Sequence, residues 1–202
     1  MRPEPDRGKD PPVDELIAVL MVASGVVFRR AADQRELRLC LAIREDVVRV
    51  AGWDGVPDRD HWDDEAIQVI GWDGRDAVCT GRIVLPGGPL PTEVAAGLSM
   101  LPRNGVVDVG RMAVRPDRQE FRHRVFAGLL AGLYATVRQE GFSVACGMMS
   151  PAARMLVKML GVQVTVLGAD EPYRGALRAP VRFDTGSLPA KHEAGIRTAE
   201  PE

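Results

Sequence analysis

The stretch Val106-Val-Asp-Val-Gly-Arg-Met-Ala-Val-Arg-Pro116 decides how this chain folds. Its apolar residues predict a buried β-strand, yet Asp108 and Arg111 lie inside the run, and burying an unpaired charge is costly. Three positions separate the two charges, so a regular strand would point them to opposite faces. A bulge at Gly110 would bring both side chains to one face, which is typical of a site. Alternatively, Asp108 only neutralises Arg111 or Arg82.

The composition bounds the class of protein. A chain of 202 residues suits one domain, expected over residues 13–184, with polar, disordered tails at 1–12 and 185–202. A net charge of −2 argues against general nucleic-acid binding. No apolar run is long enough for a membrane span or a signal sequence, which favours a cytoplasmic protein.

The cysteines and histidines argue against disulfides and metal sites. The three cysteines are widely spaced in apolar contexts, which predicts free, buried thiols in a reducing compartment: Cys40, Cys79 and Cys146. The three histidines lack the spacing of metal ligands, so we expect no metal cofactor.

The periodicity along the chain predicts a mixed sheet with helices packed on it. We expect a helix or strand and then a strand within residues 13–30, a helix from Asp33 to Gly52, and an acidic loop over 54–64. The remaining elements are expected as follows: strands at 67–70 and 77–85, a short helix with a loop at 92–104, the strand at 106–116, a helix at 124–140, a strand at 143–149, a helix at 151–160, and strands at 162–167 and 179–183. Arg44 falls on the apolar stripe of its helix and therefore needs a carboxylate partner.

This order, with a long helix directly after Ala113-Val-Arg-Pro-Asp-Arg118, resembles the GNAT acyltransferase superfamily. The resemblance implies an α+β sandwich: a mixed, mostly antiparallel sheet with a splayed, bulged central strand and helices on both faces. The acyl donor would lie in the splay, with its phosphate at the following helix. The donor-binding residues would be Met112, Ala113, Val114, Arg118, Arg122 and Arg124. The family's phosphate-loop glycines are absent, and Val157 stands where a tyrosine general acid is often found.

Four motifs in order are similar to one branch, the acyl-homoserine-lactone (autoinducer) synthases and the N-acyl amino acid synthases. Its acidic pattern E-x-D-x-aromatic-D resembles Asp58-Arg-Asp60-His-Trp62-Asp63. Its R-x-x-x-F followed by Trp resembles Arg44, Val48 and Trp53. Its R-L-L-P resembles Arg82-Ile-Val-Leu-Pro86, and its E-x-S-R-F strand resembles Asp108-Val-Gly110-Arg111-Met112.

The resemblance implies an N-acyltransferase that moves an acyl group from acyl-CoA or an acyl carrier protein to the amine of a small, amino-acid-like acceptor. Its most specific form would be homoserine-lactone synthesis from S-adenosylmethionine. Asp108 and Arg111 would be catalytic, with Asp108 taking the amine proton directly or through water. The substrate-binding residues would be Arg44, Trp53, Asp60, Trp62, Asp63 and Arg82. Arg82 or Arg111 would pair with a substrate carboxylate.

Each of these assignments has a structural alternative. The arginines and aspartates could only support the fold, and the two tryptophans could only anchor loops. The basic cluster from Arg115 to Arg124 is either a solvated helix end or a docking surface for a phosphopantetheine phosphate or an acidic carrier protein. The rival function is a non-catalytic module of this fold that binds an acyl thioester or another protein.

Overall fold

The computed structural model describes residues 13–185 except 54, 58, 103 and 160, with only the backbone described at 13 and 119. The helices are α1 (Val13–Ser24), α2 (Gln34–Ala51), α3 (Pro91–Ala96), α4 (Arg122–Gln139) and α5 (Pro151–Met159), with 3₁₀ helices at His61–Asp64 and Pro116–Phe121. The strands are β1 (Val27–Arg30), β2 (Ile67–Asp73), β3 (Asp76–Val84), β4 (Val106–Val114), β5 (Val144–Met149), β6 (Val164–Val166), β7 (Glu171–Tyr173) and β8 (Ala176–Asp184).

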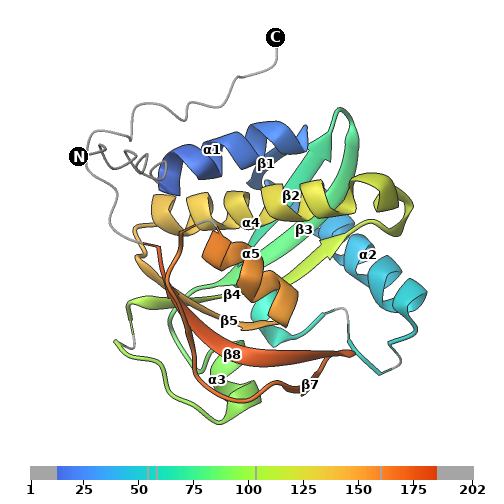
Figure 1. Ribbon diagram of the computed structural model, residues 1–202. Helices are drawn as coiled ribbons and strands as arrows, with labels where there is room; N and C mark the ends of the chain where they lie inside the picture. The colour runs from blue at the N-terminus through green and yellow to red at the C-terminus, as the bar shows by residue number, and fades with distance from the viewer. Residues whose placement is uncertain (1–12, 54, 58, 103, 160, 186–202) are drawn as a thin grey trace, which may run out of the picture.

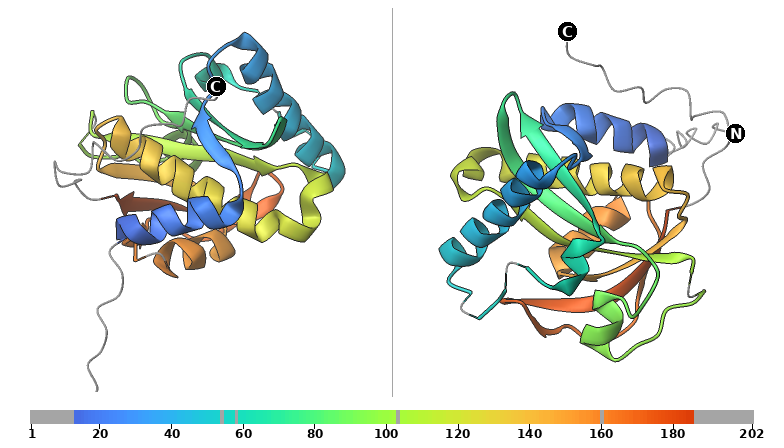
Figure 2. Two further views of the ribbon diagram at one scale, coloured as in Figure 1. Left: turned by 90° about the horizontal axis from the view of Figure 1, so that it is seen from above. Right: turned by 180° about the vertical axis from the view of Figure 1, so that it is seen from behind.

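The strands form one mixed sheet in the order β1-β2-β3-β4-β5-β8-β6, with β7 paired to β8 (Figure 1). The neighbours β4 and β5 run parallel, and the other neighbouring pairs are antiparallel. Seen from above, α1 and α4 lie on one face of the sheet and α2 on the other (Figure 2). The predicted GNAT-like arrangement is therefore confirmed. Among the described residues, no helix is long and apolar enough to cross a membrane.

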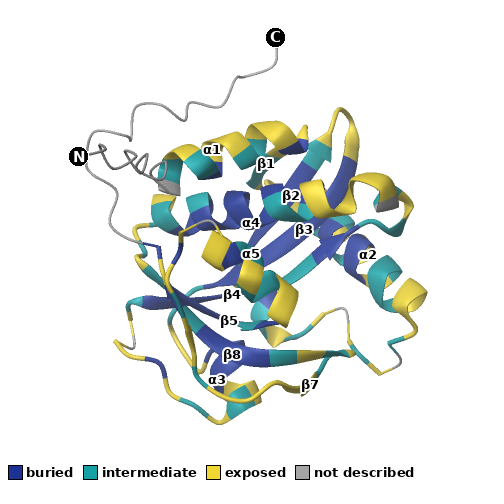
Figure 3. Ribbon diagram, viewed as in Figure 1, coloured by how far each residue is buried: buried dark blue, intermediate teal, exposed yellow. Residues whose placement is uncertain are grey.

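The hydrophobic core fills both sides of the sheet (Figure 3). The larger cluster lies between the sheet and α4, where Leu129 and Val137 are fully buried with Val107 of β4. A smaller cluster joins α2 to the opposite face and includes Ile43 and Ala113. The central strands are thus covered on both faces, which explains why their sequences read as apolar runs.

Several predicted boundaries shift in the structure. The end signals of α2 are confirmed, because Asp33 accepts a hydrogen bond from the Glu36 amide and Gly52 adopts a left-handed conformation. The ambiguous segment after residue 13 is a helix. The last strand begins at Ala176 rather than 179, because a hairpin with the unpredicted β7 extends it. The expected tails lie outside the described residues except Thr185, which is buried.

The bulge expected in β4 is present, one residue later than its glycine suggested. Gly110 pairs with Arg82 of β3 and Ala113 pairs with Thr80, so two residues of β4 oppose one of β3. The left-handed residue of the bulge is Arg111, with φ +52°.

The bulge resets the alternation of β4. Before it, Val107 and Val109 face α4; after it, Val114 faces α4 and Ala113 faces α2. Asp108 precedes the bulge on the face away from α4. The predicted consequence is confirmed, because Asp108 and Arg111 line the same cavity.

Candidate active site

A cavity of about 80 Å³ opens on the α2 side of the sheet, where β4 and β5 separate. The two strands pair over residues 106–108 and 144–146, and they approach closely at Gly147, where an added Cβ would lie 2.6 Å from the Val109 carbonyl oxygen. The cavity lies beyond this point, between the bulge, the end of α2 and the β7–β8 hairpin. A cavity needs about 10–15 Å³ to hold one water molecule. This cavity is several times larger, so it can hold a group of several non-hydrogen atoms.

Asp108 is the one carboxylate among the described residues that line this cavity. The residue is 3% exposed, and its carboxylate accepts a hydrogen bond from the Thr92 amide at 2.8 Å and a weak one from Cys146 Sγ at 3.6 Å. Burial raises the pKa of Asp108, and this effect outweighs the Thr92 contacts and the nearby charge of Arg82. No ion pair within the described chain joins it to Arg82 or Arg111, so the alternative in which Asp108 pairs directly with one of these arginines is not formed. In its ionised form, Asp108 can accept a proton from a group bound in the cavity.

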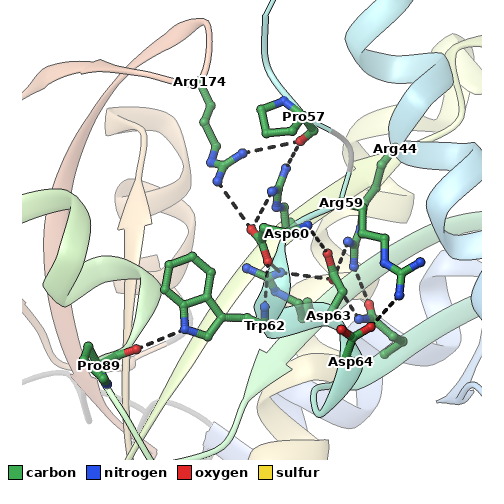
Figure 4. Close-up of polar contacts among 12 residues, drawn as sticks. Arg44, Pro57, Arg59, Asp60, Trp62, Asp63, Asp64, Pro89 and Arg174 are labelled. Atoms are coloured by element: carbon green, nitrogen blue, oxygen red, sulfur yellow. Dashed lines mark hydrogen bonds and ion pairs between the residues drawn. The ribbon is translucent and has the colours of Figure 1, made fainter.

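The predicted charge network is formed by the acidic loop with α2 and the sheet (Figure 4). Arg82 lies 2.5 Å from Asp60 Oδ1 and 3.0 Å from Asp63 Oδ1, and Arg44 lies 2.7 Å from Asp63 Oδ1. Arg44 also donates to Gln68. The carboxylate partner predicted for Arg44 is thus confirmed. Burial acts to raise the pKa of Asp63, but the two guanidinium groups dominate and lower it to about 2.

Arg111 is held in its left-handed conformation by the same acidic loop. Its guanidinium donates to the Pro57 carbonyl oxygen at 2.5 Å and to Asp60 Oδ2 at 2.6 Å. Arg174 of the β7–β8 hairpin, also at positive φ, reaches the same two acceptors at 3.5 Å each (Figure 4). A left-handed non-glycine residue costs about 1–2 kcal/mol, so these contacts must outweigh the strain of the bulge.

The predicted tryptophans have different positions. Trp53 lines the cavity and packs on the hairpin so tightly that a Cβ on Gly175 would lie 2.4 Å from its ring. Trp62 donates to the Pro89 carbonyl oxygen at 3.0 Å and is not among the cavity-lining residues, so it anchors a loop. Asp58, the first residue of the acidic motif, lies outside the described residues.

The predicted donor-binding residues are only partly brought together. Met112 and Ala113 line the cavity, whereas Val114 is buried in the core. Arg118 lies 3.2 Å from both Asp73 and Asp76, so acidic side chains of the β2–β3 hairpin occupy it. The last two predicted arginines, Arg122 and Arg124, are exposed in the first turn of α4.

Sequence analysis missed the contribution of the β7–β8 hairpin. Tyr173, Arg174 and Arg178 all line the cavity. The signal was present, because Arg178 interrupts an apolar strand just as Arg82 does. Starting that strand at residue 179 left it out. Thr92 was also missed, because a short helix gives no sequence sign of the carboxylate that its amide contacts.

The three cysteines are free and buried, and burial raises the pKa of Cys79 to about 12. No group of three or more His, Cys, Asp or Glu in the described residues could hold a metal ion.

The splayed, bulged β4, the parallel β4–β5 pair and the helix that follows the bulge define a GNAT-like fold. Solved structures of acyltransferases share it. The chain is 17% identical to BjaI, a CoA-dependent acyl-homoserine lactone synthase solved with SAM and isopentyl-CoA, with a TM-score of 0.63 over 76% of this chain and 78% of BjaI. It is 16% identical to FeeM, an N-acyl amino acid synthase from uncultured soil microbes, with a TM-score of 0.52 over 79% and 89%.

A protein of Desulfovibrio desulfuricans assigned to the GNAT family is 18% identical, with a TM-score of 0.53 over 80% of this chain and 99% of that one. No protein-family model and no curated protein sequence matches the chain. At these identities the structural likeness establishes the fold, and the chemistry has to be argued from the site.

Proposed function

We propose that this protein is an N-acyltransferase that moves an acyl group from a thioester to the amine of a small acceptor. The observation that carries the proposal is Asp108. This buried carboxylate faces a cavity at the splay of β4 and β5, and within the described chain it has no cationic partner in contact. A carboxylate left without a counter-ion costs stability, so a functional role accounts for its position.

The chemistry follows from this position. The neutral amine attacks the thioester carbonyl carbon, a C–N bond forms, the C–S bond breaks and a thiolate leaves. Asp108 accepts the proton that the amine nitrogen loses, and the proton passes on to give the free thiol. The raised pKa of Asp108 brings the carboxyl closer to the basicity that this proton transfer needs.

The splayed strand can supply the donors for the oxyanion. The Arg115 amide donates to the Val78 carbonyl oxygen on β3. Because amides alternate along a strand, the Val114 amide would point to the other side, where β5 has diverged. An amide in this position could bind the developing negative charge of the carbonyl oxygen. The thioester arm would run past Met112 and Ala113, and the exposed Arg122 and Arg124 would meet its phosphate.

The proposal also covers the identity of the acyl donor and of the amine acceptor. The donor would be an acyl-CoA or an acyl carrier protein, and the acceptor an amino acid or S-adenosylmethionine. BjaI was solved with SAM and isopentyl-CoA, and TofI, another solved structure of this fold, in a ternary complex with an inhibitor and MTA. S-adenosylmethionine and acyl-CoA are therefore the first compounds to test with this chain.

The test is release of free thiol from acyl-CoA and acyl carrier protein thioesters, with and without S-adenosylmethionine or each L-amino acid. We expect release that needs both donor and acceptor and that falls at least 100-fold in Asp108→Asn. Asp46→Asn is the matched control, because Asp46 lies in a partly exposed ion pair on α2. Donor binding without release across the whole panel, or full release by Asp108→Asn, would refute the proposal. The first result would favour a non-catalytic thioester-binding module.

A further inference from the structure

We propose that Arg178 binds the carboxylate of the acceptor, so that the acceptor is a free amino acid and the product keeps its carboxylate. This inference rests on the proposed function and narrows its acceptor class. It assigns a specificity-determining residue on β8, outside the four motifs that led to the fold.

The first argument is the charge around the cavity. Five arginines line it, whereas Asp108 is the one carboxylate among its described lining residues: Arg44, Arg82, Arg111, Arg174 and Arg178. Asp60 and Asp63 lie behind these arginines and contact them. With Asp108 they make three carboxylates against five arginines. The cavity therefore carries an excess of positive charge even with Asp108 ionised, which favours an anionic ligand.

The second argument is that the other arginines already have anionic partners. Asp63 binds Arg44, and Asp60 binds Arg82 and Arg111 at 2.5 and 2.6 Å. Arg174 reaches Asp60 at 3.5 Å. We predicted that Arg82 or Arg111 would hold a substrate carboxylate, but the acidic loop occupies both.

Arg178 is different. No ion pair within the described chain involves its guanidinium, whereas Arg82 and Arg111, whose Nε atoms are buried without a hydrogen-bond partner like that of Arg178, each pair with Asp60. Glu171 lies opposite it in the β7–β8 register, yet the two side chains do not pair. Burial lowers the pKa of Arg178; Tyr173 acts to raise it and Arg174 to lower it, and the net direction is down, so burial of the charged form is not fully compensated. A carboxylate would supply that compensation through charge-assisted hydrogen bonds.

The same geometry bears on the product. Arg178 and Asp108 line one small cavity, so an α-amino acid could place its carboxylate at Arg178 and its amine toward Asp108. Lactone formation would need the acceptor carboxylate to attack a side-chain carbon that carries a leaving group, as the sulfonium carbon of S-adenosylmethionine does. An ordinary amino acid has no such group, so the reaction would end at the N-acyl amino acid.

The experiment compares each L-amino acid with its carboxamide as acceptor, for the wild type, Arg178→Gln and Arg182→Gln. Arg182 is the matched control, because it lies on β8 but outside the cavity and donates to the Leu101 carbonyl oxygen. We expect the wild type and Arg182→Gln to prefer the acid about 10- to 100-fold in kcat/KM, mainly through KM. Arg178→Gln should lose this preference, because its kcat/KM for the acid falls toward its kcat/KM for the amide.

A second readout does not depend on turnover. The amino acid, without donor, should raise the Tm of the wild type and Arg182→Gln but not that of Arg178→Gln. Equal use of acid and amide, or a preference that survives in Arg178→Gln, would overturn the inference while thiol release upholds the proposed function. If no thiol is released, the proposed function fails, and the Tm series alone still decides whether Arg178 binds a carboxylate.

Discussion

Replacing Asp63 with asparagine should strongly destabilise the protein at neutral pH. The Asp63 side chain is 1% exposed and accepts contacts from Arg44 at 2.7 Å, Arg82 at 3.0 Å and Gln68 at 3.0 Å. Asparagine keeps the volume but removes the charge that two buried guanidinium groups share. Breaking a buried pair on one side costs about 3–5 kcal/mol.

The pKa of Asp63 gives an independent lower estimate and a pH signature. Its ordinary value is 3.8 and its folded value is about 2. Because the folded pKa is depressed, the carboxylate stabilises the fold above the unfolded pKa, and this stability is lost as the pH falls through the folded pKa. At 1.36 kcal/mol per unit, the contribution is about 2 kcal/mol, lost between about pH 4 and pH 2.

Urea denaturation at pH 7 and at intervals from pH 5 to pH 2 measures both quantities. Asp64→Asn is the control, because its neighbour Asp64 forms an exposed pair with Arg59 and should cost less than about 1 kcal/mol. The gap between Asp63→Asn and the wild type should shrink as the pH falls. A gap at pH 7 no larger than that of Asp64→Asn, or one independent of pH, would refute the role given to this carboxylate.

Three further changes test the splay, the bulge and the buried carboxylate. Gly147→Ala should cost about 1–3 kcal/mol in urea denaturation, since its Cβ would meet the Val109 carbonyl, whereas Gly88→Ala, with open space around it, should be neutral. Arg111→Ala should be about 1 kcal/mol less stable than Arg111→Gly, because both lose the guanidinium contacts but only alanine keeps the left-handed strain; equal stability would contradict the bulge conformation. Thiol release should rise with pH, with a midpoint above the ordinary pKa range of an aspartate, and Asp108→Asn should abolish this rise. At pH 7, Asp108→Asn should also unfold at a higher urea concentration than the wild type, because the raised pKa of Asp108 means that its ionisation opposes folding.

The fold could be predicted from local sequence signals because those signals agree with the packing. The cap at Asp33, the stop at Gly52 and the apolar stripe of α4 each have a short-range physical cause, and each lies where it was expected. The bulge could also be predicted, because two charges three positions apart in an apolar strand need a change of parity. Its left-handed residue could not, because Arg111 adopts that conformation only with Pro57 and Asp60 as tertiary partners.

The partners within the site could not be predicted for a related reason. Sequence spacing indicated that Arg44 needed a carboxylate, but which aspartate lay within reach depended on where the loop after α2 returned to the sheet. The sequence left open whether Asp108 pairs with an arginine, because both residue types occur within apolar strands. Instead it contacts the Thr92 amide, from a short helix whose sequence carries no charge signal for it.

The acidic loop accounts for why so many arginines can lie around one small cavity. Asp60 contacts Arg82, Arg111 and Arg174, so a single carboxylate ties together β3, the bulge of β4 and the β7–β8 hairpin. Each of these contacts fixes a guanidinium in place and provides a carboxylate that balances its charge. Arg178 lies beyond the reach of this loop, and its unmet charge follows from the same arrangement that satisfies the others. In the proposed function, the acidic residues engage four arginines of the cavity wall and leave the fifth, Arg178, to bind the ligand.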